Sequence, residues 1–142
     1  MKKFVFSMQK ILELREFEEE QAKIELGKAI TETNRIQQEL EVIAAERVKM
    51  ISVCENSSVQ DMVINERYIT RLDLSRDRLL EELAAAQLIL DEKRQLFSEA
   101  MKNRKVLSKL KEKQLATYKK DLQINEDNNI DDFASAKFQP SI

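Results

Sequence analysis

Apolar residues recur at alternating spacings of three and four along most of the chain. This spacing keeps one face of a helix turned toward a partner helix. Between residues 8 and 54, fourteen positions share one such register and ten of them are apolar; between 69 and 107, nine of twelve positions are apolar. The pattern then continues in a shifted phase at Leu110, Leu115, Tyr118 and Leu122. The sequence therefore predicts two long helices. The positions that should face the partner helix are called the seam. They are Met8, Leu12, Arg15, Glu19, Ala22, Leu26, Ala29, Thr33, Ile36, Leu40, Ile43, Arg47, Met50 and Cys54 in the first helix, and Ile69, Leu72, Arg76, Leu79, Leu83, Ala86, Leu90, Lys93, Phe97, Ala100, Arg104 and Leu107 in the second.

A single cluster of turn-forming residues, at 55–58, separates the two series. Ser57 and Gln60 match a capping box for the second helix, and Ser7 is the expected N-cap of the first, with Phe6 and Ile11 at the staple positions. A short connection makes neighbouring helices antiparallel. We therefore predict an all-α fold, an antiparallel two-helix coiled-coil hairpin whose longer second helix overhangs the first. Its expected parts are an N-terminal arm (1–7), helix 1 (8–55), a turn (56–58), helix 2 (59–125) and an acidic, frayed tail (126–142).

Folding the chain at this turn sets residues side by side when their numbers sum to roughly 114. Everything beyond about residue 110 is then left without a partner from helix 1. The register also offers an opposite charge to several charged seam positions, pairing Arg15 with Glu99, Glu19 with Lys93 and Arg94, Arg76 with Glu39, and Arg47 with Glu66.

The composition supports a helical structure and argues against most catalytic chemistry. The chain has one Gly and one Pro, and Ala, Glu, Lys, Leu and Arg make up about half of it, which is typical of coiled coils and excludes a sheet protein or a Rossmann-like enzyme. The chain contains no His, the usual general base and metal ligand, and its single Cys54 cannot form an internal disulfide or a cysteine-rich zinc site. Gly27 alone cannot form a phosphate loop. We expect no catalytic residue, no metal site and no cofactor.

Charge is unevenly distributed in the overhang. Residues 102–120 carry eight basic side chains and one acidic side chain, and the residues after 120 are acidic. The basic segment also holds apolar side chains on one face, which favours docking to a protein over a solvated helix end. Phe4 and Phe6 are equally compatible with docking and with packing inside the chain. The candidate partner-binding residues are Phe4, Phe6, Lys109, Lys111, Lys113, Leu115, Tyr118, Lys119 and Leu122.

Three segments resemble the flagellar export protein FliJ family. The run from Phe4 to Glu16, with its alternating Phe residues, Gln-Lys pair and Leu-x-x-Arg stretch, is similar to the opening of these proteins. The segment 107–113 resembles the family's Lys-rich helix. The segment Ile130-Asp131-Asp132-Phe133-Ala134 resembles the family's closing Leu-Asp-Glu-Ile-Ala pattern and differs from it at three of five positions.

This resemblance implies a non-enzymatic component of the flagellar type III export apparatus, used in flagellum biogenesis and motility. It implies a stalk-like protein whose chain ends approach the pore of the export ATPase hexamer FliI, while the coiled coil contacts the membrane export-gate protein FlhA, with export chaperones as further partners. The implied location is cytoplasmic, at the inner face of the inner membrane. Exposed candidates for the gate contact, off the predicted seam, are Gln37, Val42, Val48 and Leu74.

Two other functions remain open. One is a structural coiled-coil scaffold that dimerises along continuous or parallel helices and has no ATPase partner. The turn formers at 55–58 distinguish it from the hairpin, because a straight helix would only be weakened there. The other is a nucleic-acid binder that uses residues 102–120, although that segment has only Tyr118 as a stacking group. The apolar stretch at 4–6 is too short for a signal peptide, and no window is apolar enough to span a bilayer.

Overall fold

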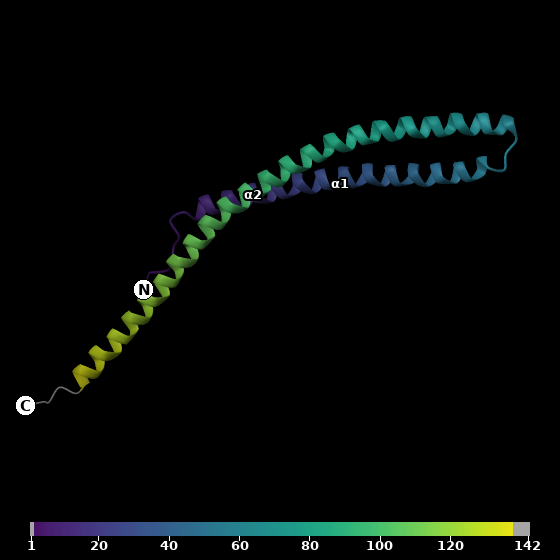
Figure 1. The fold of residues 1–142 in the computed structure, drawn as a ribbon. Helices are drawn as coiled ribbons and strands as arrows, with labels where there is room; N and C mark the ends of the chain where they lie inside the picture. Colours follow the sequence, from purple (N-terminus) through teal and green to yellow (C-terminus); the bar gives the residue numbers. More distant parts are fainter. Residues whose placement is uncertain (1, 138–142) are drawn as a thin grey trace, which may run out of the picture. The chain divides into compact units, whose positions relative to one another are not determined.

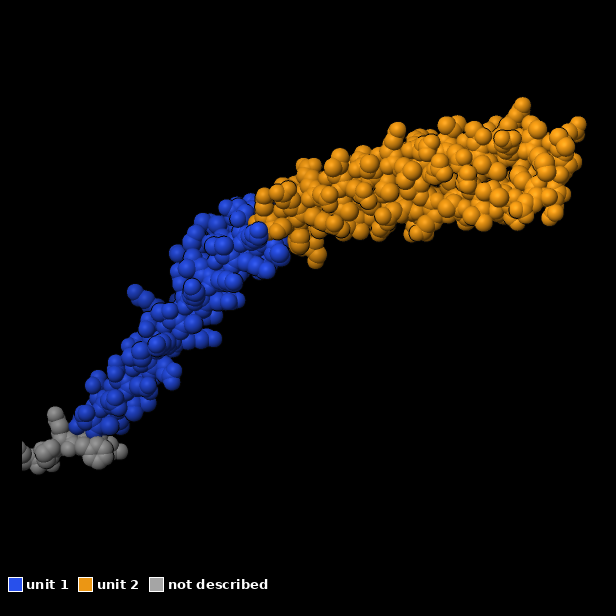
Figure 2. All heavy atoms as spheres, in the orientation of Figure 1, with its two compact units in different colours: residues 1–19, 100–142 blue, residues 20–99 orange. Residues whose placement is uncertain are grey.

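The computed structural model describes residues 2–137 and shows two helices, α1 (Gln9–Cys54) and α2 (Val59–Lys137) (Figure 1). The all-α hairpin expected from the sequence is confirmed. The chain divides into two compact units (Figure 2). Unit 2 spans residues 20–99 and contains the turn, where α1 and α2 lie antiparallel; unit 1 combines the arm and the start of α1 (2–19) with α2 from residue 100 onward.

The seam predicted from the apolar spacing is the buried face of both helices. Each of its 26 positions is buried or half-buried. In unit 2 the core forms around Ile36, Leu79 and Ala86, of which Ile36 is 2% exposed and Leu79 4% exposed. The partly buried Leu40, Ile43 and Leu83 pack against this cluster. Two helices bury only one stripe each, so this narrow core supplies most of the apolar burial in unit 2.

The polar residues Thr33 and Arg47 on the seam both have hydrogen-bond partners. Thr33 is buried, and its hydroxyl donates to the carbonyl oxygen of Ala29 at 2.9 Å. Arg47, half-buried, donates to Asp73 across the seam at 2.8 Å. A buried polar group without a partner would cost on the order of 1–3 kcal/mol, and these bonds remove that cost.

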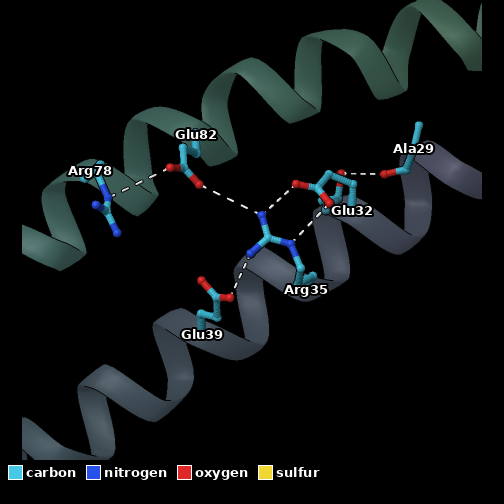
Figure 3. A network of polar contacts seen from close by, with 7 residues as sticks. Ala29, Glu32, Arg35, Glu39, Arg78 and Glu82 are labelled. Carbon is cyan, nitrogen blue, oxygen red and sulfur yellow. Dashed lines mark hydrogen bonds and ion pairs between the residues drawn. The ribbon is translucent and has the colours of Figure 1, made fainter.

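Arg35 is the centre of a polar network on the edge of the seam (Figure 3). Its guanidinium donates to Glu32 at 2.6 Å and to Glu39 at 2.7 Å on α1, and it lies 4.0 Å from Glu82 on α2, which is also near Arg78. The hydrogen bond from Arg35 lowers the pKa of Glu32, and the bonds to Glu32 and Glu39 raise the pKa of Arg35. All these groups are solvent-exposed, so each pair adds little to stability.

The helix caps lie one residue later than the sequence analysis placed them. The Ser58 hydroxyl accepts from the amide of Asp61 at 3.3 Å, so Ser58 caps α2. Ser57, the expected cap, instead donates to the carbonyl of Val53 at 2.7 Å and closes the end of α1. At the other end the Met8 carbonyl accepts the first bond of α1, from Leu12, so Met8 takes the cap position expected for Ser7.

The predicted charge partners were wrong, although the antiparallel pairing was right. Arg15 binds Glu18, Glu19 binds Arg104, Arg47 binds Asp73, and Arg76 lies near Asp73 and Asp77. The hydrogen bond from Tyr68 to Glu46 follows the predicted register, whereas the ion pairs Arg47–Asp73 and Arg104–Glu19 join residues of higher number than it allowed. Side chains on a helix lean toward its N-terminus, so in an antiparallel pair each long side chain reaches a level nearer its own N-terminus. Two long side chains that meet therefore belong to residues with higher sequence numbers than a pair whose Cα atoms lie at the same height along the two helices.

Helix α2 extends past Asn125, where the tail was expected to fray, and ends at Lys137. No Gly or Pro interrupts residues 59–137, so nothing in the backbone ends the helix earlier. Phe138 and Pro140 lie outside the described residues.

Replacing Leu79 by Ala is expected to lower the free energy of unfolding by about 2–4 kcal/mol, because it removes a buried side chain and leaves a cavity. The matched control is Leu88→Ala on the same helix, where the leucine is 73% exposed and the expected change is within about 0.5 kcal/mol. Urea unfolding followed by circular dichroism measures both. Equal effects of the two substitutions would contradict the assigned seam.

Candidate functional site

The arm and the two helices of unit 1 share a small apolar core. Phe6, Leu12 and Leu107 are buried together, with 4%, 3% and 8% of their surfaces exposed. Phe4 and Met8 pack against this cluster. Ile11, the staple partner of Phe6 expected from the sequence, is 43% exposed, and Leu12 takes its place, in keeping with the later start of α1. Phe6 is thus a core residue of unit 1, and its side chain is not available on the surface.

The arm continues along α2 beyond the start of α1. The ring of Phe4 packs on that of Tyr118, with centroids 5.5 Å apart and an interplanar angle of 46°. The Tyr118 hydroxyl donates to the carbonyl oxygen of Lys2. The residues from Lys2 to Phe6 therefore cover α2 between Leu107 and Tyr118, and of the two readings weighed for Phe4 and Phe6 the structure shows packing within the chain.

Two polar contacts hold the start of α1 against α2. Arg104 donates to both carboxylate oxygens of Glu19, the shorter bond being 2.5 Å, and this pair is half-buried. The carboxylate raises the pKa of Arg104. Lys111 donates to the side-chain oxygen of Gln9 at 2.8 Å. Lys111, a predicted docking residue, is therefore engaged inside unit 1.

Other predicted docking residues lie in the basic segment of α2. Lys109, Lys113 and Lys119 are exposed, and Leu115 and Leu122 are half-buried. From residue 119 to residue 136 each side chain is exposed except those of Leu122 and Ala134. Figure 1 shows the last turns of α2 running on beyond the arm. The structure thus leaves Lys109 and Lys113 exposed at the level of the arm, and Lys119 exposed just past Tyr118.

The sequence-derived site set omitted three large apolar side chains on the last turns of α2. Ile124 is 46% exposed, Ile130 65% and Phe133 70%. Ile130 and Phe133 lie in the segment that was expected to fray, and a frayed segment has no fixed face; Ile124 lies inside the predicted helix. The spacing of Leu122, Ile130 and Phe133 on a continuous helix is the signal that would have revealed them.

Candidate gate-contact residues lie in unit 2, off its seam. Val42 is 59% exposed, Val48 69% and Leu74 65%. Val42 also lines a shallow surface groove of about 500 Å³ together with Arg35, Glu39, Ser75 and Arg78. Isolated exposed apolar residues are common on proteins, so these positions stay predictions.

The described residues contain no cluster of three or more His, Cys, Asp or Glu side chains placed to hold a metal ion. Over the same part of the chain, neither helix has a stretch that is long and apolar enough to cross a membrane.

A family model described as "Flagellar FliJ protein" matches residues 4–141. The match covers nearly the whole chain, so the chain belongs to this family, and it is a component of the flagellar export apparatus. No curated protein and no solved structure matches the sequence.

Replacing Phe6 by Ala is expected to release the arm from α2. The lost burial costs on the order of 3 kcal/mol. This cost should raise the population of chains with a detached arm more than tenfold. Trypsin cleavage after Lys3 in the native protein should accelerate at least about tenfold on this basis. Val5→Ala is the matched control, because Val5 is 81% exposed and its loss should leave the rate nearly unchanged. An unchanged rate in Phe6→Ala would show that the arm is not held by this core.

Proposed function

We propose that this FliJ family member is a non-enzymatic, stalk-like component that couples the export ATPase hexamer FliI to the membrane export gate FlhA. The observation that carries the proposal is the exposed basic segment of α2, at Lys109, Lys113 and Lys119, at the level where α1 begins and where α2 continues past it. Helix ends that project exposed side chains past their partners are suited to insertion into another protein.

The basic segment would act through electrostatics and packing. Clustered lysines raise the rate at which an acidic surface is encountered, and the half-buried Leu115 and Leu122 offer apolar contacts once the two proteins meet. A segment that contacts one interface of an ATPase ring better than the others biases which interface closes. Such a partner couples hydrolysis or ring assembly to the gate and needs no catalytic group of its own.

Unit 2 supplies the proposed gate contact. Val42, Val48 and Leu74 are exposed there, and the groove beside Val42 combines apolar and charged side chains. The same exposed surface is also proposed to receive export chaperones. In this role the protein works in the cytoplasm, at the inner face of the inner membrane, and takes no cofactor.

The structure weighs against both alternatives. A scaffold of continuous helices would run through residues 55–58, but α1 ends at Cys54 and α2 begins at Val59 under a Ser58 cap. Single-stranded nucleic acid would need stacking platforms in the basic segment. Tyr118 is the aromatic residue available there, and its ring is already packed against Phe4.

The double variant Lys109→Glu and Lys113→Glu is expected to weaken binding to the export ATPase and to reduce any stimulation of its hydrolysis. Reversing two charges should raise the dissociation constant about tenfold, or about 1.4 kcal/mol, with the difference shrinking as salt is added. Both lysines are exposed and have no partner in the described residues, so the hairpin should stay folded.

The control is Lys23→Glu with Lys49→Glu, which makes the same change in charge at exposed positions of unit 2. Binding measured by surface plasmon resonance should be unaffected by it. Equal losses in both double variants would indicate a general effect of net charge and contradict the proposed docking segment. Loss of DNA binding without loss of ATPase binding would favour the nucleic-acid alternative.

A further inference from the structure

The end of α2 presents an apolar face that nothing in the described chain covers. The arm's last contact along α2 is at Tyr118, and beyond it Ile130 and Phe133 expose about two thirds of their surfaces, at 65% and 70%. Large apolar side chains gathered on one helix face usually mark a contact with another protein.

Six residues line this face. At 100° per residue, they fall within an arc of about 80° around the helix. Two of them, Lys119 and Glu126, are exposed and carry opposite charges. The set, named the terminal strip from here on, is Leu115, Lys119, Leu122, Glu126, Ile130 and Phe133.

Charge along the terminal strip changes sign near its middle. Residues 102–120 carry eight basic side chains against one acidic, and residues 121–132 carry five acidic side chains and no basic one. A parallel neighbour would set like charges beside each other, whereas an antiparallel copy sets the basic half against the acidic half. We propose that the terminal strip binds the terminal strip of a second copy of this chain, antiparallel, with the twofold axis beside Leu122.

One register pairs five of the six residues of the terminal strip, and Phe133 lies beyond these pairs. With the axis beside Leu122, this residue meets the partner's Leu122, and Leu115 meets the partner's Ile130. Lys119 then faces the partner's Glu126. Because a twofold interface repeats each contact, the pair forms two Lys119 to Glu126 ion pairs. Charged and polar residues within coiled-coil interfaces set partner choice and orientation, and Lys119 and Glu126 lie within the arc of the terminal strip.

The arm does not block this surface. It is held by Leu107 and Tyr118, which at 100° per residue lie outside the arc of the terminal strip, on one side of it. Lys119 is exposed and Leu122 only half-buried in the single chain. The arm therefore borders the terminal strip and leaves it open to a second helix.

Self-association goes beyond the proposed docking to an ATPase. The terminal strip shares Leu115, Lys119 and Leu122 with the proposed ATPase-binding surface, so a dimer and an ATPase complex would exclude each other. The pairing would keep the free protein's apolar end out of water until the ATPase displaces the second copy. The test below contains no ATPase, so failure of this inference leaves the proposed function untouched, and the reverse also holds.

The experiment is sedimentation equilibrium of the full chain over a concentration series at low ionic strength. The wild type is expected to show a monomer–dimer equilibrium that weakens as salt is added. Lys119→Glu and Glu126→Lys should each raise the dimer dissociation constant at least about tenfold, because each replaces two attractive pairs by two repulsive ones.

An equimolar mixture of Lys119→Glu and Glu126→Lys should dimerise about as well as the wild type, since every pair in the heterodimer is again attractive. The matched controls are Lys113→Glu and Asp131→Lys, which make the same charge changes on the opposite face of α2 and should leave the constant nearly unchanged. Circular dichroism checks that all variants keep their helix content.

Three results would overturn the inference: a wild type that stays monomeric at every concentration, a dimer that neither single variant weakens, or a mixture no better than its components. A dimer that responds equally to the controls would indicate a general effect of charge, and would overturn it as well.

Discussion

An antiparallel hairpin can bury only as much of its longer helix as the rest of the chain can cover. Here α1 has 46 residues and α2 has 79, and the turn at 55–58 sets where pairing begins. Within unit 1 the arm extends the cover to Tyr118, through Phe4 and Phe6. The rest of α2 has no apolar partner in the described chain. The exposure of the terminal strip beyond Tyr118 follows from this difference in length.

On the seam, apolar burial stabilises the helix pair, and a few polar contacts favour one register. Burial of Ile36 and Leu79 stabilises the pair, and polar positions add register specificity to such apolar contacts. The Arg104–Glu19 and Arg47–Asp73 contacts, in units 1 and 2, are half-buried and tie particular residues together. Placing either charge beside a wrong partner would leave it poorly satisfied. Such contacts can therefore favour one register, as polar positions do in other coiled coils.

The sequence predicted the features that depend on local periodicity. Every seam position lies on the buried face, because spacings of three and four are a property of the helix itself. The ion-pair partners could not be predicted by matching level residues, since long side chains such as Arg104 lean toward the helix N-terminus. In the candidate site, the exposure of Lys119 followed from the length difference. The burial of Phe6 depended on how the arm folds back, which periodicity does not reveal.

The central claim is that the uncovered end of α2 is where the export ATPase docks. Hydrogen–deuterium exchange measures this most directly, with the free chain compared with its complex with the ATPase hexamer, at a concentration where the free chain is monomeric. The account predicts new protection of backbone amides between residues 109 and 137, and none near the turn at 55–58. Protection confined to residues 20–99 would contradict it.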